Sequence, residues 1–325
     1  MTRVPRGLAA GAAAAAAVAG YRLGWRLVRV MPEAAAYRLF EHIADAMFRR
    51  NGRSVERMRD NYAIVRPDLG PAELDELVAR GVRSYLRYWC EAFRLPELSP
   101  DDVARAVRVE GAGPVRDALA SGRSIVAFLG HLGNWDMAGA WATTNLGPVV
   151  TVAERLEPEQ VFEEFLAFRE ELGMTIIPLT GGGKVFDQLL EHARGGANVI
   201  PLLADRDLTH TGIEVDFAGD RSRVAVGPAA LALDTESSLH PVSITYERHA
   251  DGPGGWRTVI TFHPAVAPTP GLTRDVAIET MTQECATALG EVVRDRTEDW
   301  HMMQRVFVRH LDGRHRRRAP TRGAP

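Results

Sequence analysis

A histidine and an aspartate, separated by four residues, stand in the stretch GHLGNWDMAG at residues 130–139. His131 follows an apolar run typical of a strand, and a glycine-containing turn then leads into a helix that carries Asp136. On one continuous helix two residues five apart point about 140° from each other. In a strand–turn–helix corner, where Gly133 permits the turn and Asn134 caps the helix, the carboxylate can reach back to the imidazole. It would fix the ring's tautomer and leave the other nitrogen as a general base. A metal ligand and an ordinary polar turn residue remain alternatives.

A second polar cluster lies in PLLADRDLTHTGIEVDF, where Asp205 and Asp207 follow another apolar run and Arg206 stands between them. One interpretation is a carboxylate and arginine network at the same end of the sheet as His131. A second is an acidic turn that caps a helix and forms salt bridges. A third is a divalent metal site, because oxygen and nitrogen ligands are available in sufficient number: His131, Asp136, Asp205, Asp207 and His210.

Several common motifs are absent or incomplete. Residues 181–184 read GGGK, but the spacing of a phosphate-binding loop fails and Lys184 is followed by Val185, which is neither Ser nor Thr. The sequence contains no G-x-S-x-G nucleophile elbow and no G-x-G-x-x-G after a strand, which disfavours a serine hydrolase or a nucleotide-binding dehydrogenase. Cys90 and Cys285 lie far apart, so a disulfide framework or a cysteine-based zinc site is not expected.

The elements that must position these residues alternate along the chain. Residues 31–110 have helical patterns, with a helix stop at residues 51–52 and a helix start at Pro71. Later apolar runs predict strands at 124–131, 148–154, 174–180, 198–205, 240–247 and 257–264. Helical stretches at 136–145, 158–172, 184–195, 227–235 and 273–296 separate or follow them. This alternation predicts an α/β fold with a central, mostly parallel sheet flanked by helices and preceded by a helical layer. The last two strands, joined by a Gly/Pro loop at 251–255, resemble a hairpin.

The chain of 325 residues carries a formal net charge of −3, too small to suggest nucleic acid as a partner. The alanine-rich stretch at 7–20 is short for a transmembrane span, and its extension to residue 30 includes three arginines, each costing roughly 2.5–3.5 kcal/mol near a bilayer centre. A signal peptide is an alternative without a convincing cleavage context. Arg22, Arg26 and Arg29 share one helical face, with apolar residues and Trp25 around it, a pattern typical of an interfacial anchor. The alternative is a helix that packs against its own domain.

From these patterns, and from the family resemblance described next, we expect three parts. Residues 1–30 form an N-terminal membrane-associating helix, 31–311 form the catalytic domain, and 312–325 form a disordered basic tail.

Several segments together resemble the bacterial lipid A acyltransferase family of the lauroyl and myristoyl type, whose fold is like that of glycerolipid acyltransferases: HLGNWD, TVAERLEPE, LLADRDLTHTGIEVDF and DWHMMQ. Within this family, the segments GWRLVRVMPE, YWCEAFRLP and HLGNWDMAGAW are similar to the actinobacterial branch that acylates phosphatidylinositol mannosides. The similarity extends from about Tyr21 to Leu311.

The resemblance implies transfer of a long-chain acyl group, typically palmitoyl, from acyl-CoA to a mannose hydroxyl of a phosphatidylinositol mannoside. The reaction would occur at the cytoplasmic face of the inner membrane, with the protein bound peripherally and without a metal or other cofactor. The family's His and Asp fall on His131 and Asp136, and its arginine falls on Arg169. Its later acidic residue falls on Asp205, where the resembled branch carries glutamate. The resemblance thus makes His131 and Asp136 the catalytic pair, and Arg169 and Asp205 the substrate-binding residues.

Two other functions remain open. The first is a metal-dependent hydrolase that uses His131, Asp136, Asp205 and Asp207, which chelation would reveal. The second is a lipid-binding protein with the acyltransferase fold but without turnover. Backbone amides near Gly133 are one guess for the donors that would stabilise the oxyanion of an acyl transfer reaction.

Overall fold

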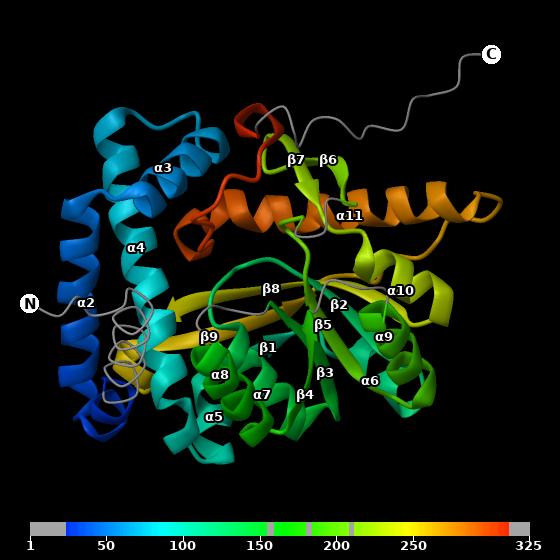
Figure 1. Ribbon diagram of the computed structural model, residues 1–325, viewed down its shortest axis with the longest axis horizontal. Coiled ribbons are helices and arrows are strands. Elements are labelled where there is room, and N and C mark those ends of the chain that lie inside the picture. Colours follow the sequence, from blue (N-terminus) through cyan, green and yellow to red (C-terminus); the bar gives the residue numbers. More distant parts are fainter. Residues whose placement is uncertain (1–23, 155–158, 180–183, 208–210, 312–325) are drawn as a thin grey trace, which may run out of the picture.

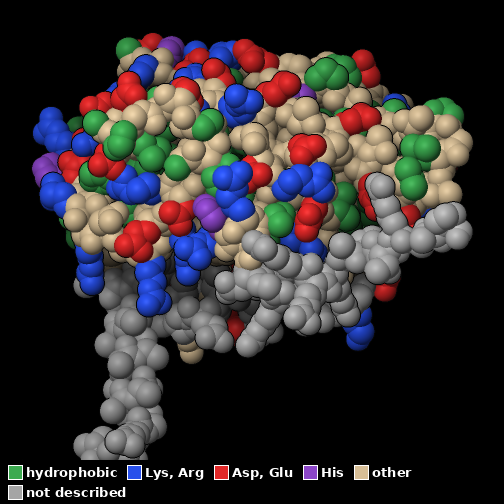
Figure 2. All heavy atoms as spheres, turned by 90° about the horizontal axis from the view of Figure 1, so that it is seen from above, with side chains coloured by type: hydrophobic (Ala, Val, Ile, Leu, Met, Phe, Trp, Pro, Cys, Tyr) green, Lys and Arg blue, Asp and Glu red, His purple; other side chains and the backbone are tan. Residues whose placement is uncertain are grey.

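The computed structural model describes residues 24–154, 159–179, 184–207 and 211–311 (Figure 1). Outside these ranges lie the alanine-rich stretch at 7–20, Arg22, the glycines at 181–183, His210 and the basic tail at 312–325. Seen from above the view of Figure 1, acidic and basic side chains are intermixed over the face of the molecule (Figure 2).

The N-terminal part is helical as expected, with α2 (Glu33–Arg50), α3 (Arg53–Val65), α4 (Pro71–Arg94) and α5 (Pro100–Ala106). The predicted helix stop is confirmed, because α2 ends where Asn51 adopts a left-handed conformation with φ of 45°. Pro71 opens α4, where its missing N–H leaves no intrahelical bond unmade. The expectation of helix up to residue 110 is wrong at its end, since β1 (Val107–Glu110) pairs with the sheet.

The described residues form a seven-stranded sheet in the order β1-β9-β8-β2-β5-β3-β4. The six predicted strands are confirmed, as β2 (Ile125–Leu129), β3 (Val149–Glu154), β4 (Met174–Leu179), β5 (Val199–Leu203), β8 (Ser238–Arg248) and β9 (Trp256–Phe262). All pairings in this sheet are parallel except the hairpin of β8 and β9, which the loop at 251–255 predicted. The small antiparallel pair β6 (Ile213–Phe217) and β7 (Asp220–Val224) was not predicted; β6 lies within the second polar cluster, and β7 follows it directly.

Both faces of the sheet are covered, which is why its strands appear in the sequence as short continuous apolar runs. In β2, Val126 and Phe128 belong to one buried cluster, while Ile125, Ala127 and Leu129 belong to the other. The first cluster is completed by α9 (Lys184–Gly195), α10 (Gly227–Thr235) and α11 (Arg274–Asp295), and also includes residues of α2–α4. The second is completed by α5, α6 (Gly113–Ala120), α7 (Trp135–Asn145) and α8 (Glu159–Glu171). In Figure 1, α2 and α4 stand side by side at one end of the sheet.

Residues 24–30 are helical and pack against the rest of the protein. Trp25 and Val28 are buried, and the Trp25 indole N–H donates to the Phe93 carbonyl at 3.0 Å. Trp25 is therefore not available as an interfacial anchor, whereas Leu27 and Val30 remain 55% and 79% exposed. Among the described residues, no helix combines the length and the apolar character that crossing a membrane requires.

Contact between α3 and α4 depends on Gly81. A Cβ placed on Gly81 would lie 2.5 Å from the Tyr62 hydroxyl. That hydroxyl donates to the Trp300 carbonyl at 2.8 Å, so the close approach of α3 to α4 also supports the C-terminal segment.

We expect Gly81→Ala to lower the free energy of unfolding by about 1–3 kcal/mol, because overpacking at Tyr62 outweighs the higher helix propensity of alanine. Urea unfolding measures the change. Gly113→Ala is the control, since a Cβ there meets nothing within 4 Å. Equal stability of the Gly81 variant and the wild type would contradict this account of the α3–α4 contact.

Candidate active site

The strand–turn–helix corner at residues 129–137 is confirmed. Gly133 adopts φ of +55°, and a Cβ on it would lie 2.4 Å from the Ile244 carbonyl oxygen, so only glycine fits without strain. The Asn134 side chain caps α7 by accepting a hydrogen bond from the Met137 amide at 2.9 Å. The corner thus places His131 beyond the carboxyl end of β2, where open α/β sheets bind ligands.

The carboxylate that holds the His131 ring is that of Asp205. The ring's Nδ1 lies 2.6 Å from Asp205 Oδ1, and the His131 amide donates to Asp205 Oδ2 at 2.8 Å. The pairing follows from the register of the two parallel strands. Leu129 of β2 lies opposite Leu203 of β5, so His131 and Asp205, each two positions further along, also lie opposite each other. The expectation that Asp136 orients the imidazole is therefore wrong.

Asp205 is itself held in place and wholly buried. Besides the two bonds with His131, its Oδ2 accepts the Trp300 indole N–H at 2.8 Å. Burial by itself would raise the pKa of Asp205, but the charge and hydrogen bonds of His131, with the bond from Trp300, lower it overall. A carboxylate with no exposed surface cannot contact a substrate directly, so the expected substrate-binding role does not fit Asp205. It acts on His131 instead.

Asp136 lies in the first turn of α7 and faces into the protein. Its Oδ1 accepts a hydrogen bond from Arg169 Nε at 2.7 Å, and its Oδ2 accepts one from the Tyr88 hydroxyl at 2.8 Å. The Asp136 side chain is only 2% exposed, whereas the Arg169 side chain is 19% exposed. Asp136 therefore ties α7 to α4 and α8 and sets the position of an arginine that reaches the surface. The family resemblance assigned Asp136 and Arg169 to one site but did not predict the contact between them.

Behind the corner, Glu91 on α4 organises a buried polar network. Its carboxylate accepts hydrogen bonds from Asn134 Nδ2 at 2.8 Å, from the Tyr246 hydroxyl at 2.8 Å and from the Tyr37 hydroxyl at 3.1 Å. Burial raises the pKa of Glu91, although these donors oppose the shift. The network joins α2, α4, β8 and the cap of α7, and it therefore fixes the turn that carries His131.

A second network approaches His131 from the C-terminal segment. The His301 amide donates to the His131 carbonyl at 2.7 Å, and the Gly133 amide donates to the Asp299 carbonyl at 2.9 Å. The Ser84 hydroxyl donates to Asp299 Oδ1 at 2.9 Å and lies 3.0 Å from His301 Nε2. Burial raises the pKa of Asp299 to about 6 and lowers that of His301 to about 3. The His131 loop is thus held from both sides by backbone bonds.

Three of the backbone amides near Gly133 are already bonded within the protein and cannot serve as oxyanion donors. The amide of His131 is bonded to Asp205, that of Leu132 to the Gly130 carbonyl, and that of Gly133 to the Asp299 carbonyl. What the site offers is the imidazole, whose side chain is 24% exposed and whose Nδ1 is held by a carboxylate. Nε2 is then the nitrogen that can take a proton from a substrate.

The carboxylates proposed as metal ligands do not gather around one point. Asp136 pairs with Arg169, and Asp207 pairs with Arg223 at 3.3 Å. Within the described ranges, no three His, Cys, Asp or Glu side chains are grouped as a metal site would require. His210 lies outside those ranges. The two cysteines are buried and not bonded to each other.

The residues that sequence reasoning missed are the supports of the site: Tyr88, Glu91, Asp299, Trp300 and His301. Glu91 had one local sign, since it is an acidic residue among apolar ones in YWCEAF. Asp299, Trp300 and His301 belong to the segment DWHMMQ, which contributed to the family resemblance, but no role was predicted for any of its residues. No local pattern predicts that a tryptophan near the C-terminus donates to a carboxylate after β5.

Comparison with known proteins places this site in a class of enzymes. The family model described as bacterial lipid A biosynthesis acyltransferase matches residues 15–309, and the chain belongs to that family. It is an acyltransferase.

Two mycobacterial relatives share much of the sequence, and each bears the name phosphatidylinositol mannoside acyltransferase. The protein of Mycolicibacterium smegmatis is 38% identical over 305 residues, which cover 93% of this chain and 95% of that protein. The protein of Mycobacterium tuberculosis is 38% identical over 294 residues, covering 90% of this chain and 88% of that protein.

The buried Asp299 makes stability depend on pH. Its pKa is about 6 in the folded chain against 3.8 for an ordinary aspartate. Between these values the folded chain holds a proton that the unfolded chain has released, so stability falls as pH rises from about 4 to 6. Through Asp299 the free energy of unfolding falls by about 3 kcal/mol over this range, and it stays lower above pH 6.

We expect Asp299→Asn to remove this part of the pH dependence. Its amide can donate to the Ser84 hydroxyl, which can then donate to His301 Nε2, while the amide oxygen accepts from the Tyr246 N–H. Urea midpoints measured from pH 4 to 7 test the prediction, with Asp251→Asn at an exposed position as the control. Parallel pH profiles for the wild type and Asp299→Asn would refute it.

Proposed function

We propose that this acyltransferase moves a long-chain acyl group, in the first instance palmitoyl, from acyl-CoA to a mannose hydroxyl of a phosphatidylinositol mannoside. The observation that carries the proposal is the His131 imidazole, partly exposed and held at Nδ1 by the buried Asp205 carboxylate. The names of the two mycobacterial relatives support the choice of acceptor.

His131 is the general base in this reaction. With the proton on Nδ1 facing Asp205, Nε2 accepts the proton of the mannose hydroxyl as its oxygen attacks the thioester carbonyl. Collapse of the tetrahedral intermediate breaks the carbon–sulfur bond, and the imidazolium returns the proton to the departing CoA thiolate. Asp205 stabilises the imidazolium and prevents the ring from turning. The thioester supplies its own leaving group, so the scheme needs no metal and no covalent enzyme intermediate.

Asp136 serves the reaction through its neighbours. Because both of its oxygens are engaged by Arg169 and Tyr88, it positions the Arg169 guanidinium beside the corner that carries His131. Arg169 then binds polar or anionic groups of a substrate. In this assignment Arg169 contacts the substrate, while Asp136 and Asp205 are positioning residues.

Association with the cytoplasmic face of the inner membrane completes the proposal. The helix at 24–30 exposes Leu27 and Val30, and α2 exposes Leu39 and Ile43, which are 39% and 43% exposed. Arg26 is also exposed on the first of these helices. Apolar side chains beside a cation suit a surface of anionic phospholipid, where the acceptor resides.

Radiolabelled palmitoyl-CoA incubated with a panel of phosphatidylinositol mannosides tests the activity. We expect labelled glycolipid product with the wild type, with or without EDTA, and turnover about 10²–10⁴-fold lower for His131→Ala. Asp205→Asn should lose a similar factor, because its amide N–H faces Nδ1 and forces the proton onto Nε2, which can no longer act as a base.

Asp101→Asn, at an exposed position on α5, is the matched control and should keep full turnover. Near-normal turnover in folded His131→Ala would eliminate the base mechanism, and EDTA-sensitive turnover would revive the metal-dependent hydrolase. Binding of both substrates without product would identify a lipid-binding protein. Transfer to a lipid A precursor alone would change the acceptor within the family.

Membrane association predicts a second result. We expect Leu27→Ser combined with Val30→Ser to weaken binding to vesicles of anionic phospholipid roughly tenfold or more, since burying a large apolar side chain contributes about 1.5–3 kcal/mol. Vesicle sedimentation measures the change. Leu272→Ser with Val276→Ser is the control, because these residues are similarly apolar and are 40% and 44% exposed on another part of the surface. Equal losses of vesicle binding in the two double variants would contradict a specific membrane-docking face.

A further inference from the structure

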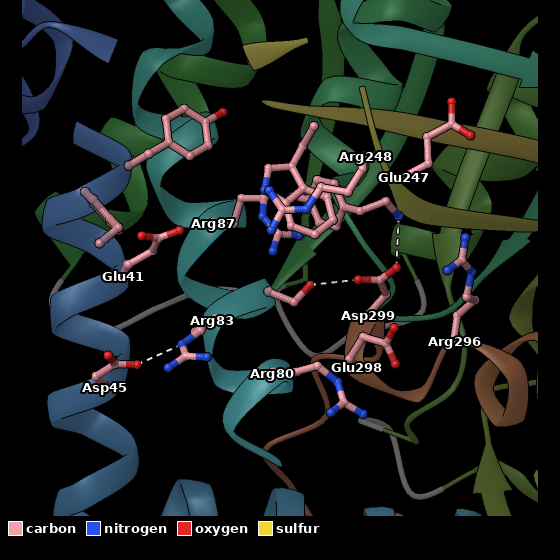
Figure 3. Close-up of a pocket in the computed structure, with 15 residues that line it drawn as sticks. Glu41, Asp45, Arg80, Arg83, Arg87, Glu247, Arg248, Arg296, Glu298 and Asp299 are labelled. Carbon is pink, nitrogen blue, oxygen red and sulfur yellow. Dashed lines mark hydrogen bonds and ion pairs between the residues drawn. The ribbon is translucent and has the colours of Figure 1, made fainter. Parts of the chain in front are cut away.

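A cavity of about 600 Å³ lies between α2, α4, the C-terminal end of β8, the start of β9 and η3 (Thr297–Asp299). Figure 3 shows the arginine side chains around it. Neither His131 nor Arg169 lines this cavity. It is a separate feature from the candidate active site and has no part in the acyl transfer scheme above.

Helix α4 presents two different faces. Arg80, Arg83, Ser84 and Arg87, at positions i, i+3, i+4 and i+7, all line the cavity and form one stripe of the helix. Tyr88, which is rotated by about 100° from Arg87, points to the other site and donates to Asp136. One helix therefore forms the wall between the cavity and the catalytic corner.

Of the five arginines that line the cavity, only Arg83 forms an ion pair with a lining carboxylate. Asp45 is used by Arg83 at 2.8 Å, and Glu247 is used by Arg108 and Arg257, which lie outside the lining. Asp299 accepts hydrogen bonds from the Ser84 hydroxyl and the Tyr246 amide. Within the described ranges, the lining carboxylates without an ion pair are Glu41, Glu298 and Asp299. Four lining arginines likewise make no ion pair with a carboxylate: Arg80, Arg87, Arg248 and Arg296.

Two of these guanidinium groups are pre-positioned by an aromatic ring. Arg87 lies 3.5 Å from the centroid of the Trp256 ring and Arg248 lies 3.8 Å from it. Stacking uses the flat face of a guanidinium and leaves its N–H edges for hydrogen bonds. Donors fixed in this way match the oxygens of a phosphate group, which arginine binds in a bidentate manner.

We propose that this cavity is a phosphate-ester binding site, distinct from the catalytic corner. The excess of unpaired guanidinium groups selects an anion, and a volume of about 600 Å³ accommodates a phosphorylated polyol or a nucleotide as well as the phosphate itself. The preference for phosphate rests on the cavity alone. The source of the phosphate would be either the inositol phosphate headgroup of the acceptor or the nucleotide end of CoA. This assignment to a substrate rests on the proposed function.

The cavity and the catalytic loop share a residue. Asp299 lines the cavity with its side chain, and its carbonyl accepts the Gly133 amide two residues from His131. A phosphate ester bound here holds one end of a substrate on the far side of α4 from the base. Occupancy also stabilises the segment that supports His131.

Isothermal titration calorimetry of the full chain, without any acyl donor, tests the proposal with three probes: glycerophosphoinositol, adenosine bisphosphate and inorganic phosphate. We expect one of the two esters to bind with 1:1 stoichiometry. In Arg80→Gln combined with Arg248→Gln, the Kd for that ester should rise by about tenfold or more, because hydrogen bonds to charged groups contribute about 1.5–3 kcal/mol each.

Two controls make the outcome decisive. Arg53→Gln, at an exposed position of α3 outside the cavity, should bind like the wild type, and His131→Ala should also keep the affinity. Tighter binding of glycerophosphoinositol identifies the acceptor headgroup as the source of the phosphate, and tighter binding of adenosine bisphosphate identifies CoA.

Failure of both esters to bind, or binding unchanged in a folded Arg80/Arg248 double variant, would overturn the proposal. Binding of inorganic phosphate without either ester would likewise overturn it, because the site would then take a free anion and no phosphate ester. Since calorimetry needs no turnover, a negative acyl transfer assay would leave this measurement intact, and the two proposals fail independently.

Discussion

The hydrogen bond between His131 Nδ1 and Asp205 Oδ1, 2.6 Å long, is the interaction on which the geometry of the candidate active site depends. It exists because β2 and β5, which are far apart in the chain, are parallel neighbours in register. Two residues that each follow a strand are thereby brought to the same edge of the sheet. The carboxylate is buried and fully bonded, so it cannot relax away from the imidazole, and the ring keeps one tautomer.

The surrounding structure prevents that pair from moving. Trp300 donates to Asp205 from the C-terminal segment, and Glu91 holds the cap of α7 from α4. Buried polar groups are costly unless they are satisfied, and here almost every donor meets an acceptor in networks that join elements distant in sequence. These networks stabilise one geometry of the catalytic loop. Helix α4 contributes to both networks and also separates the catalytic corner from the arginine-lined cavity.

The spacing of His131 and Asp136 has a different meaning from the one that the sequence suggested. The two residues share a corner, but the first turn of α7 directs the Asp136 carboxylate inward to Tyr88 and Arg169. One carboxylate orients the histidine and the other orients an arginine. Sequence proximity suggested a contact between His131 and Asp136 that the structure does not contain, because hydrogen bonds in an α/β site form across strands and layers and not along the chain.

The amino-acid sequence by itself determined the α/β class, the positions of six strands, the β8–β9 hairpin, the glycine turn and the Asn134 cap, because each depends on local periodicity, local conformational preference or a short loop. The resemblance of several motifs also indicated the family. Tertiary structure decided the strand order, and with it the choice of Asp205 over Asp136 as the partner of His131. It also decided that Trp25 is buried and that arginines spaced along α4 meet Trp256 across a cavity. Such contacts join residues tens or hundreds of positions apart, and no local pattern records which distant segment will become a neighbour.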